Sequence, residues 1–248
     1  RAVLALLLLV VVSVVWWTEP IALFGMLQWA TPDIVWRVPT TEPLVALSFD
    51  DGPHPVNTPQ VLSVLAAHDA HATFFLIGQR ARAHPEIVEA IKASGNEVGN
   101  HYLNRGTCLT DRLDAFSARV SEAEQAIRPS EPKLLRPPAG LAWPWQLRRA
   151  RQLGYTCVLG SGYPHDPAHP PVGYIRWLVK KNLVPGAVII LHDGISDPSR
   201  TLQALPDILL AGRARGLRFV TVGALLAKQR GRRARGWSRR SWRKRRSF

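Results

Sequence analysis

Cysteine and acidic residues are scarce in this chain of 248 residues, and each shortage excludes a class of protein. Two cysteines, Cys108 and Cys157, exclude a disulfide-dense scaffold and a zinc site built from thiolates alone. Whether these two pair with each other stays open at this stage. Acids number 18 against 32 Lys and Arg, which gives a formal net charge of +14. The hydrophobic fraction of 46% nevertheless fits a packed core and excludes a disordered chain.

The positive charge is concentrated at the C-terminus. Residues 228–248 hold 11 Lys and Arg and no acid, whereas residues 1–227 hold 21 Lys and Arg with all 18 acids. The net charge of +14 therefore divides into +11 for the tail and +3 for the rest. A nearly neutral body argues against specific nucleic-acid binding. We expect residues 228–248 to form a disordered basic tail that contacts anionic lipid or cell-wall polymer, with a merely solvated tail as the alternative.

No apolar run reaches the roughly 20 residues that a helix usually needs to cross a bilayer. Residues 2–17 are interrupted only by Ser13 and end in Trp16 and Trp17, which suit a membrane interface. A second apolar stretch, residues 21–30, follows without a convincing cleavage signal. We expect residues 1–30 to be a signal anchor that places the body outside the cytoplasm, with a cleaved export signal as the alternative.

Short apolar runs alternate with helix-like segments from residue 44 onward. The expected strands are residues 44–49, 72–77, 97–101, 134–137, 155–159, 187–192 and 218–222. The expected helices are residues 58–68, 85–94, 110–127, 144–153, 173–182 and 199–215. This alternation predicts a mostly parallel sheet, either open or closed into a distorted barrel. In both folds the chemistry collects at the carboxyl ends of the strands.

Polar side chains stand where several expected strands end. The first strand ends in Ser48-Phe49-Asp50-Asp51-Gly52-Pro53, the third in Gly99-Asn100-His101, the fourth in Arg136-Pro137-Pro138-Ala139-Gly140 and the sixth in Leu191-His192-Asp193. Adjacent carboxylates after a buried strand are costly unless they are paired with a metal or a cation. Acid, base and cation at one edge of a sheet together predict a catalytic site.

These motifs resemble the polysaccharide deacetylase family of NodB-homology carbohydrate esterases, over roughly residues 41–226. The segment at residues 48–53 resembles the family's T/S-F-D-D-G-P motif. The resemblance implies an α/β fold, a distorted (β/α) barrel of about seven parallel strands in residues 41–227, preceded here by an N-terminal hydrophobic helix. It also implies a hydrolase that removes N-acetyl or O-acetyl groups from a polysaccharide such as chitin or peptidoglycan.

The resemblance assigns a catalytic role to four positions. Asp50 would be the general base that activates a water, and Arg136 would hold Asp50 by a charge-assisted hydrogen bond. His192 would be the general acid that protonates the leaving amine. The backbone N–H of Ala139 would help to stabilise the tetrahedral oxyanion.

The metal-binding motif departs from the family pattern. Asp51 and His101 would bind a divalent metal, usually zinc, but the motif H-S/T-x-x-H reads His101-Tyr102-Leu103-Asn104-Arg105 here. Arg105 therefore stands where the third ligand is expected, and a guanidinium cannot coordinate a metal. Three accounts stay open. Asn104, His54 or another side chain completes a weaker site, or Arg105 pairs with Asp51 and replaces the metal, or the chain is a catalytically impaired carbohydrate-binding protein.

Three further residues are candidates for contact with the sugar. Tyr163 and Asp166 follow the fifth strand in Ser161-Gly162-Tyr163-Pro164-His165-Asp166-Pro167, and Trp143 follows the fourth. Tyr163 and Trp143 could stack on a pyranose ring. Asp166 could instead orient His192 and raise its pKa, so that the imidazole is protonated when catalysis needs an acid.

Overall fold

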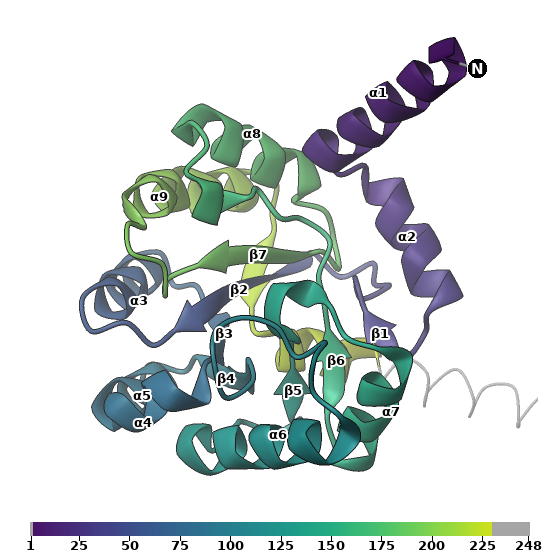
Figure 1. Cartoon of the computed structure of the whole chain (residues 1–248). Helices are drawn as coiled ribbons and strands as arrows, with labels where there is room; N and C mark the ends of the chain where they lie inside the picture. Colours follow the sequence, from purple (N-terminus) through teal and green to yellow (C-terminus); the bar gives the residue numbers. More distant parts are fainter. Residues whose placement is uncertain (1, 230–248) are drawn as a thin grey trace, which may run out of the picture.

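The computed structural model describes residues 2–229, with side chains from residue 9 onward. The predicted basic tail, residues 228–248, therefore lies outside the described residues except for its first two positions. The described chain folds into a twisted sheet of parallel strands wrapped by helices, with two N-terminal helices beside it (Figure 1). Cys108 and Cys157 are both buried and free.

The sheet contains all seven expected strands and one short additional strand. Within residues 2–229 the order is β1-β6-β5-β4-β3-β2-β7, with β8 beside β2, and every strand pair is parallel. The bounds are β1 (Ile34–Val35), β2 (Leu44–Gly52), β3 (Ala72–Leu76), β4 (Glu97–Asn100), β5 (Leu134–Leu135), β6 (Thr156–Val158), β7 (Val188–His192) and β8 (Arg218–Val220). The short strand β1 was not predicted.

The segment after β6 closes the sheet onto β7. Ser161 N–H donates to the carbonyl of Val188 at 2.8 Å, and Ile190 N–H donates to the carbonyl of Gly162 at 2.8 Å. These two bonds join the end of β6 to the far edge of the sheet. The predicted distorted barrel is confirmed.

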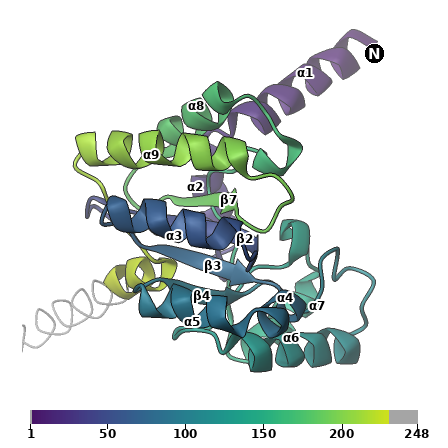
Figure 2. The same ribbon diagram turned by 90° about the vertical axis from the view of Figure 1, so that its left-hand side faces the viewer.

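The helices cover the outside of the barrel (Figure 2). Their bounds are α3 (Asn57–Ala67), α4 (Gly78–Ala83), α5 (Pro85–Ala93), α6 (Leu113–Ile127), α7 (Pro144–Gln152), α8 (Val172–Asn182) and α9 (Ser199–Ala214), with short 3₁₀ turns η1 (Pro138–Gly140) and η2 (Asp166–Ala168). Residues 222–229 are also helical. Helix α4 was not predicted, and α6 begins later than expected because Asp111 bonds to Tyr102 and Gln146 in a loop.

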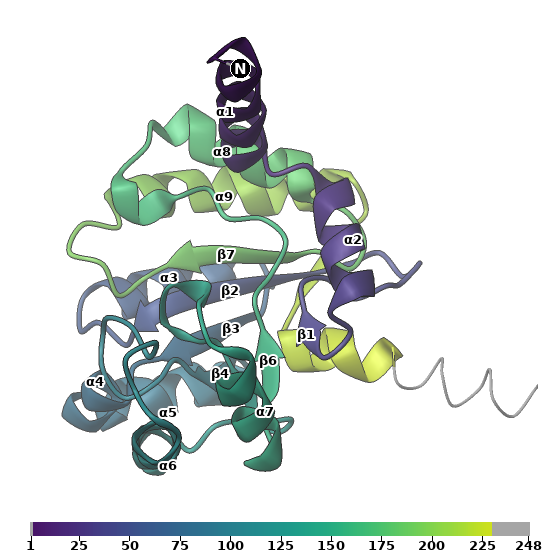
Figure 3. The same cartoon turned by 45° about the vertical axis from the view of Figure 1, so that its right-hand side comes forward.

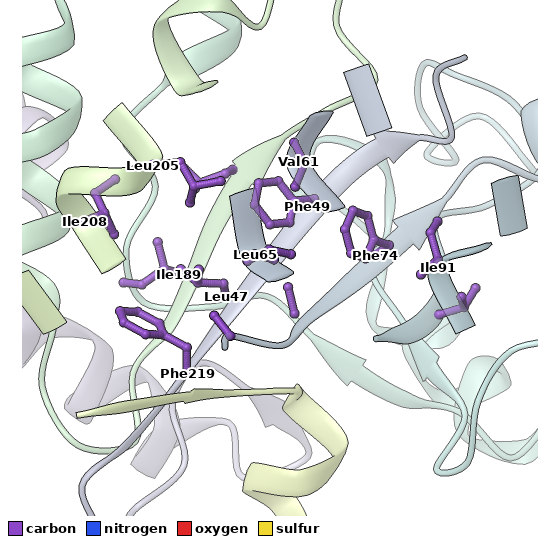
Figure 4. Packing of buried hydrophobic residues seen from close by; sticks show 14 of the residues in the cluster. Leu47, Phe49, Val61, Leu65, Phe74, Ile91, Ile189, Leu205, Ile208 and Phe219 are labelled. Carbon is purple, nitrogen blue, oxygen red and sulfur yellow. The ribbon is translucent and has the colours of Figure 1, made fainter. Parts of the chain in front are cut away.

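Successive side chains of β2 point alternately toward the surrounding helices and into the barrel interior. Leu47 and Phe49 point outward into the main core, where the Phe49 ring stacks on Phe74 with centroids 5.2 Å apart (Figure 4). Side chains alternate across a strand. Ser48 and Asp50 therefore point into the barrel, where both are buried. The same apolar pattern that anchors β2 thus aims a carboxylate at the interior.

The N-terminus forms two helices where one was expected. Helix α1 (Ala2–Thr18) extends away from the barrel and α2 (Ile21–Ala30) lies against it (Figure 3). Pro20 precedes α2, and a proline lacks the N–H that would continue α1. No single described helix has the length and hydropathy needed to cross a membrane. Leu9–Thr18 and Ile21–Ala30 meet those criteria only together, with a bend of 94° between them.

Candidate active site

A cavity of about 630 Å³ opens at the carboxyl ends of the strands. Its lining includes the four residues to which the resemblance assigns a catalytic role and the two expected metal ligands: Asp50, Arg136, Ala139 and His192, with Asp51 and His101. These residues come from the ends of β2, β4, β5 and β7 and the loops that follow. The sequence motifs, distant along the chain, therefore meet in one place.

A buried guanidinium holds the carboxylate of Asp50. Arg136 Nη1 lies 2.5 Å from Asp50 Oδ1 and also donates to Ser48 Oγ at 2.8 Å. Arg136 Nε donates to the carbonyl of Val158 at 3.1 Å, and the guanidinium lies 4.1 Å from the centroid of the Phe75 ring. Burial lowers the pKa of Arg136, and the charge of Asp50 opposes that shift. Among the described residues no hydrogen bond engages Asp50 Oδ2, which leaves one carboxylate oxygen for a water.

A second buried pair fixes His192. Its Nδ1 lies 2.9 Å from Asp166 Oδ1, while Asp166 Oδ2 accepts the His192 backbone N–H at 2.8 Å and the Thr201 hydroxyl at 2.9 Å. Burial disfavours the charged imidazole, but Asp166 and the nearby carboxylates of Asp50 and Asp51 outweigh it. They raise the pKa of His192 to about 9. At neutral pH the ring is therefore an imidazolium, and its Nε2–H is free to act in the cavity.

Asp51 and His101 face each other across a short gap. His101 Nδ1 lies 2.8 Å from the carbonyl of Arg136, so this nitrogen carries the proton, and the other nitrogen, Nε2, lies 3.4 Å from Asp51 Oδ1. A histidine that binds a metal through one ring nitrogen usually donates the N–H of the other to a carbonyl or carboxylate oxygen. Burial opposes ionisation of Asp51, but His101, His192 and Arg105 outweigh it and lower the pKa of Asp51 to about 2. Asp51 is thus an anion.

Arg105 makes only a loose contact with this pair. Its Nε lies 3.8 Å from Asp51 Oδ2, and its side chain is 61% exposed. A solvated cation at that distance contributes little to stability, about 0–1 kcal/mol. The geometry therefore does not place Arg105 as a buried substitute for a metal ion.

Two observations bear on whether a metal fits here. Within residues 2–229 no group of three His, Cys, Asp or Glu side chains could hold a metal ion. However, Asn104 lines the same cavity, and its Oδ1 is buried without a hydrogen-bond partner. His54 is not among the lining residues, and its Nδ1 accepts backbone N–H groups of its own turn at 3.3 Å. The donors present are thus a carboxylate, an imidazole and an amide oxygen.

An arginine that the sequence did not point to joins the end of β2 to the loop after β7. Arg80, in α4, donates through Nη1 to the carbonyls of Asp51 at 2.6 Å and Gly194 at 2.5 Å. A Cβ on Gly194 would lie 1.9 Å from the Asp51 carbonyl oxygen, so only glycine fits there. Nothing in the local pattern of α4 signals this role, because the two partners are backbone oxygens of distant segments.

Of the remaining candidate residues, some line the cavity and others lie outside its lining. Ala139 lines the cavity with a φ of 53°, an uncommon conformation for a residue with a Cβ. Tyr163 also lines it, with its ring centroid 5.7 Å from that of His192. Trp143 is not among the lining residues, and its indole N–H donates to the carbonyl of Leu109 at 2.9 Å. Asp166 is buried behind His192, so it orients the imidazole and does not contact a sugar.

The N-terminal segment contributes part of the cavity wall, which the sequence did not indicate. Trp16, Glu19 and Phe24 from α1, α2 and the turn between them line the cavity, together with Trp36. The apolar character of residues 1–30 had suggested a signal anchor or a cleaved export signal. A tertiary contact of this kind has no local sequence signature.

The family model described as polysaccharide deacetylase matches residues 37–158. A peptidoglycan-N-acetylglucosamine deacetylase of Bacillus cereus is 38% identical over 197 residues, covering 78% of this chain and 92% of the relative. A chitooligosaccharide deacetylase of Sinorhizobium fredii is 37% identical over 162 residues, covering 64% of this chain and 75% of the relative.

Solved structures agree with these similarities. A peptidoglycan N-acetylglucosamine deacetylase in complex with 4-naphthalen-1-yl-N-oxidanyl-benzamide superposes with a TM-score of 0.76 at 30% identity, covering 80% of this chain and 95% of that one. A CE4 family pseudoenzyme from Bacillus anthracis superposes with a TM-score of 0.71 at 21% identity, covering 78% of this chain and 68% of that one. The second likeness concerns the fold alone.

Proposed function

The chain belongs to the polysaccharide deacetylase family, and from that premise we propose that it is a hydrolase that removes acetyl groups from the N-acetylated sugars of a polysaccharide such as chitin or peptidoglycan. The observation that carries this proposal is that a candidate base and a candidate acid, each fixed by a buried ion-pair partner, line one cavity. A carboxylate held by a guanidinium and an imidazolium held by a carboxylate both line it. Amide hydrolysis needs a base and an acid of this kind.

The residues divide the reaction into two proton transfers. Asp50 takes a proton from a water as the water oxygen attacks the acetyl carbon, and the carbonyl π electrons move to the oxygen. The backbone N–H of Ala139 donates to that oxyanion. His192 then gives its Nε2 proton to the nitrogen as the oxyanion electron pair re-forms the C=O bond and the C–N bond breaks. This leaves a free amine and acetic acid, which loses its hydroxyl proton to solvent and becomes acetate. Arg136 keeps the Asp50 carboxylate in place throughout.

We propose Asp51 and His101 as the ligands of a divalent metal, with Asn104 Oδ1 as a third, weaker donor. The Nδ1–H of His101 stays on the Arg136 carbonyl, so a metal would displace the Nε2 proton and take that nitrogen, and the buried Asn104 oxygen lacks another partner. A bound metal would polarise the acetyl carbonyl and acidify a water. An amide oxygen binds zinc less strongly than an imidazole does, so we expect a weaker site than an Asp-His-His set gives.

A catalytically impaired sugar-binding protein is the second candidate, because Arg105 stands where a third strong ligand is expected. The two candidates differ in one measurement. We expect the purified protein, supplemented with zinc or cobalt, to release acetate from chitin oligomers or peptidoglycan, and Asp50→Asn to abolish that release. Binding of the oligomers without acetate release under every metal tested would favour the impaired protein.

We also propose an extracytoplasmic location with the N-terminal segment at a membrane. The exposed apolar side chains at residues 9–12 and 14 of α1 support it. Contact of the basic tail with anionic lipid or cell-wall polymer is part of the same proposal. Cosedimentation of the full chain and of a chain ending at Ala227 with vesicles containing phosphatidylglycerol tests the tail. Equal binding of both would exclude a role for it.

A further inference from the structure

The turn between α1 and α2 is built into the wall of the catalytic cavity. Trp16, Glu19 and Phe24 line that cavity together with Trp36, and the same cavity holds Asp50 and His192. Sites that enclose a drug-sized ligand have volumes of roughly 300–1,000 Å³. A cavity of about 630 Å³ therefore has room for more than the reacting acetamido group.

Several contacts fix this turn against the catalytic domain. Tyr163 N–H donates to Glu19 Oε2 at 2.6 Å, and the Tyr174 hydroxyl donates to the carbonyl of Trp17 at 2.9 Å. Lys181 donates to the carbonyl of Thr18. The Trp16 ring stacks on His165 with centroids 5.1 Å apart and an interplanar angle of 27°. The turn is thus held at the cavity by partners on α8 and on the loop after β6.

The aromatic side chains of this wall are held in place as well. Phe24 lies 6.2 Å from Trp36 between ring centroids, and Trp36 Nε1 donates to Thr31 Oγ1 at 2.9 Å. Rings that are already ordered lose little conformational entropy when a ligand binds. The wall therefore presents preorganised aromatic surface to a ligand.

Glu19 is an unusual residue for a turn whose only task is to connect two helices. Its φ of 43° lies in the left-handed region, which a non-glycine residue adopts only under strain. Its side chain is only 12% exposed. Oε2 accepts the Tyr163 N–H, whereas Oε1 lies 3.9 Å from His165 Nε2, beyond hydrogen-bond distance. One side-chain oxygen at the cavity is therefore available to a ligand, and burial raises the pKa of Glu19 to about 7.

We propose that the α1–α2 turn carries a second sugar subsite, in which Glu19 Oε1 accepts a hydrogen bond from a hydroxyl or N–H of the pyranose next to the reacting one. Trp16 and Trp36 supply apolar surface for the ring. The inference rests on the proposed function, since it concerns a neighbour of the reacting sugar. Glu19 is then a specificity-determining residue. The cavity holds two neighbouring sugars of an oligosaccharide and not a single sugar alone.

The variant Glu19→Gln distinguishes sugar binding by Oε1 from the structural hydrogen bond that Oε2 accepts from the Tyr163 N–H. The glutamine keeps one oxygen for the Tyr163 N–H and presents an amide NH₂, a donor, where the carboxylate presented an acceptor. Trp16→Ala removes a ring that is 60% exposed, so it opens no core cavity. Glu86→Gln, on the exposed surface of α5, is the matched control. Thermal melts of the full-length variants verify that each one folds.

The measurements are the Kd for N-acetylchitohexaose by calorimetry and the kcat and KM for the hexamer and for 4-nitrophenyl acetate. For Glu19→Gln we expect about tenfold increases in Kd and KM for the hexamer, the effect of losing one hydrogen bond. The kcat and the hydrolysis of 4-nitrophenyl acetate stay unchanged. Trp16→Ala gives a similar pattern, and Glu86→Gln behaves as the wild type.

The outcomes distinguish the subsite from the proposed function. If the wild type binds the hexamer without releasing acetate and Glu19→Gln still weakens binding, the proposed function fails and the subsite stands. Unchanged Kd and KM in Glu19→Gln overturn the subsite even where acetate is released. Equal losses on the hexamer and 4-nitrophenyl acetate also overturn it, because they indicate a structural role. A wild type that does not bind the hexamer overturns it as well.

Discussion

The Nδ1 atom of His192 lies 2.9 Å from Oδ1 of Asp166, and the second oxygen of the same carboxylate accepts the backbone N–H of His192. One buried aspartate therefore fixes both the ring and the backbone of the proposed acid. It also gives the ring its charge, since the pKa of His192 is raised to about 9. Each of these effects has a measurable consequence.

Asp166→Asn should shift the alkaline limb of the pH profile. Below a pKa of about 9 His192 is protonated and can act as an acid, and activity falls as the pH rises through that value. Removing the carboxylate charge lowers this pKa, so kcat/KM should begin to fall closer to neutral pH. The measurement is kcat/KM for acetate release from pH 6 to 10. An unchanged alkaline limb in Asp166→Asn would count against the assignment, and Asp114→Asn on α6 serves as control.

Arg136→Met should destabilise the fold more than the loss of a surface charge does. It leaves the Asp50 carboxylate buried beside Ser48 without its cation, which costs about 3–5 kcal/mol. The double variant Asp50→Asn/Arg136→Met should recover part of that loss, because no buried charge remains. Urea denaturation of the wild type, both single variants and the double variant measures the coupling. Purely additive effects would contradict a direct ion pair.

Arg105→His should strengthen metal binding. It places an imidazole where an exposed cation now stands 3.8 Å from Asp51 Oδ2, so it supplies a third strong ligand and removes a charge that repels the metal. We expect zinc affinity to rise by at least about tenfold, measured by calorimetry on metal-free protein. Arg105→Ala removes the charge without adding a ligand. If Arg105→Ala binds zinc as tightly as Arg105→His, the added imidazole is not a ligand.

Arg80→Met should reduce the rate more than the stability. Its guanidinium joins the carbonyls of Asp51 and Gly194, so its loss lets the end of β2 and the loop after β7 move apart. A displacement of about 1 Å can cost about 100-fold in rate. We expect kcat to fall by at least tenfold, in line with that figure, with only a small change in Tm. Arg82→Met, which breaks an exposed ion pair on the same helix, is the control and should keep wild-type activity.

The strands and their terminal motifs could be predicted because the information is local. Asp50 comes directly after the apolar run of β2, and His192 comes directly after that of β7. Helix α4 and strand β1 were missed because both are short, at six and two residues, and their sequences carry no clear periodicity. Such elements form because of their tertiary partners.

The sequence predicted the acid, base and metal-ligand candidates of the site, but it did not predict the N-terminal residues that line the cavity. Asp166 had two open roles, and burial behind His192 decides for the positioning role. Trp143 was a reasonable candidate from its place after the fourth strand, but its indole bonds to Leu109 outside the cavity lining. Glu19 could not be found at all, because its significance depends on Tyr163, 144 residues away.

The bend of 94° between the two N-terminal segments has a further consequence. If α1 is the anchor, no flexible tether separates the membrane from the cavity, since the residue that ends α1 adjoins a residue of the cavity wall. The cavity then stays close to the membrane, so the substrate must be long enough to extend to it. Only glycan strands that come to the membrane surface can be processed. Proteolytic release of residues 1–30 would detach the enzyme and at the same time remove one side of its substrate cavity.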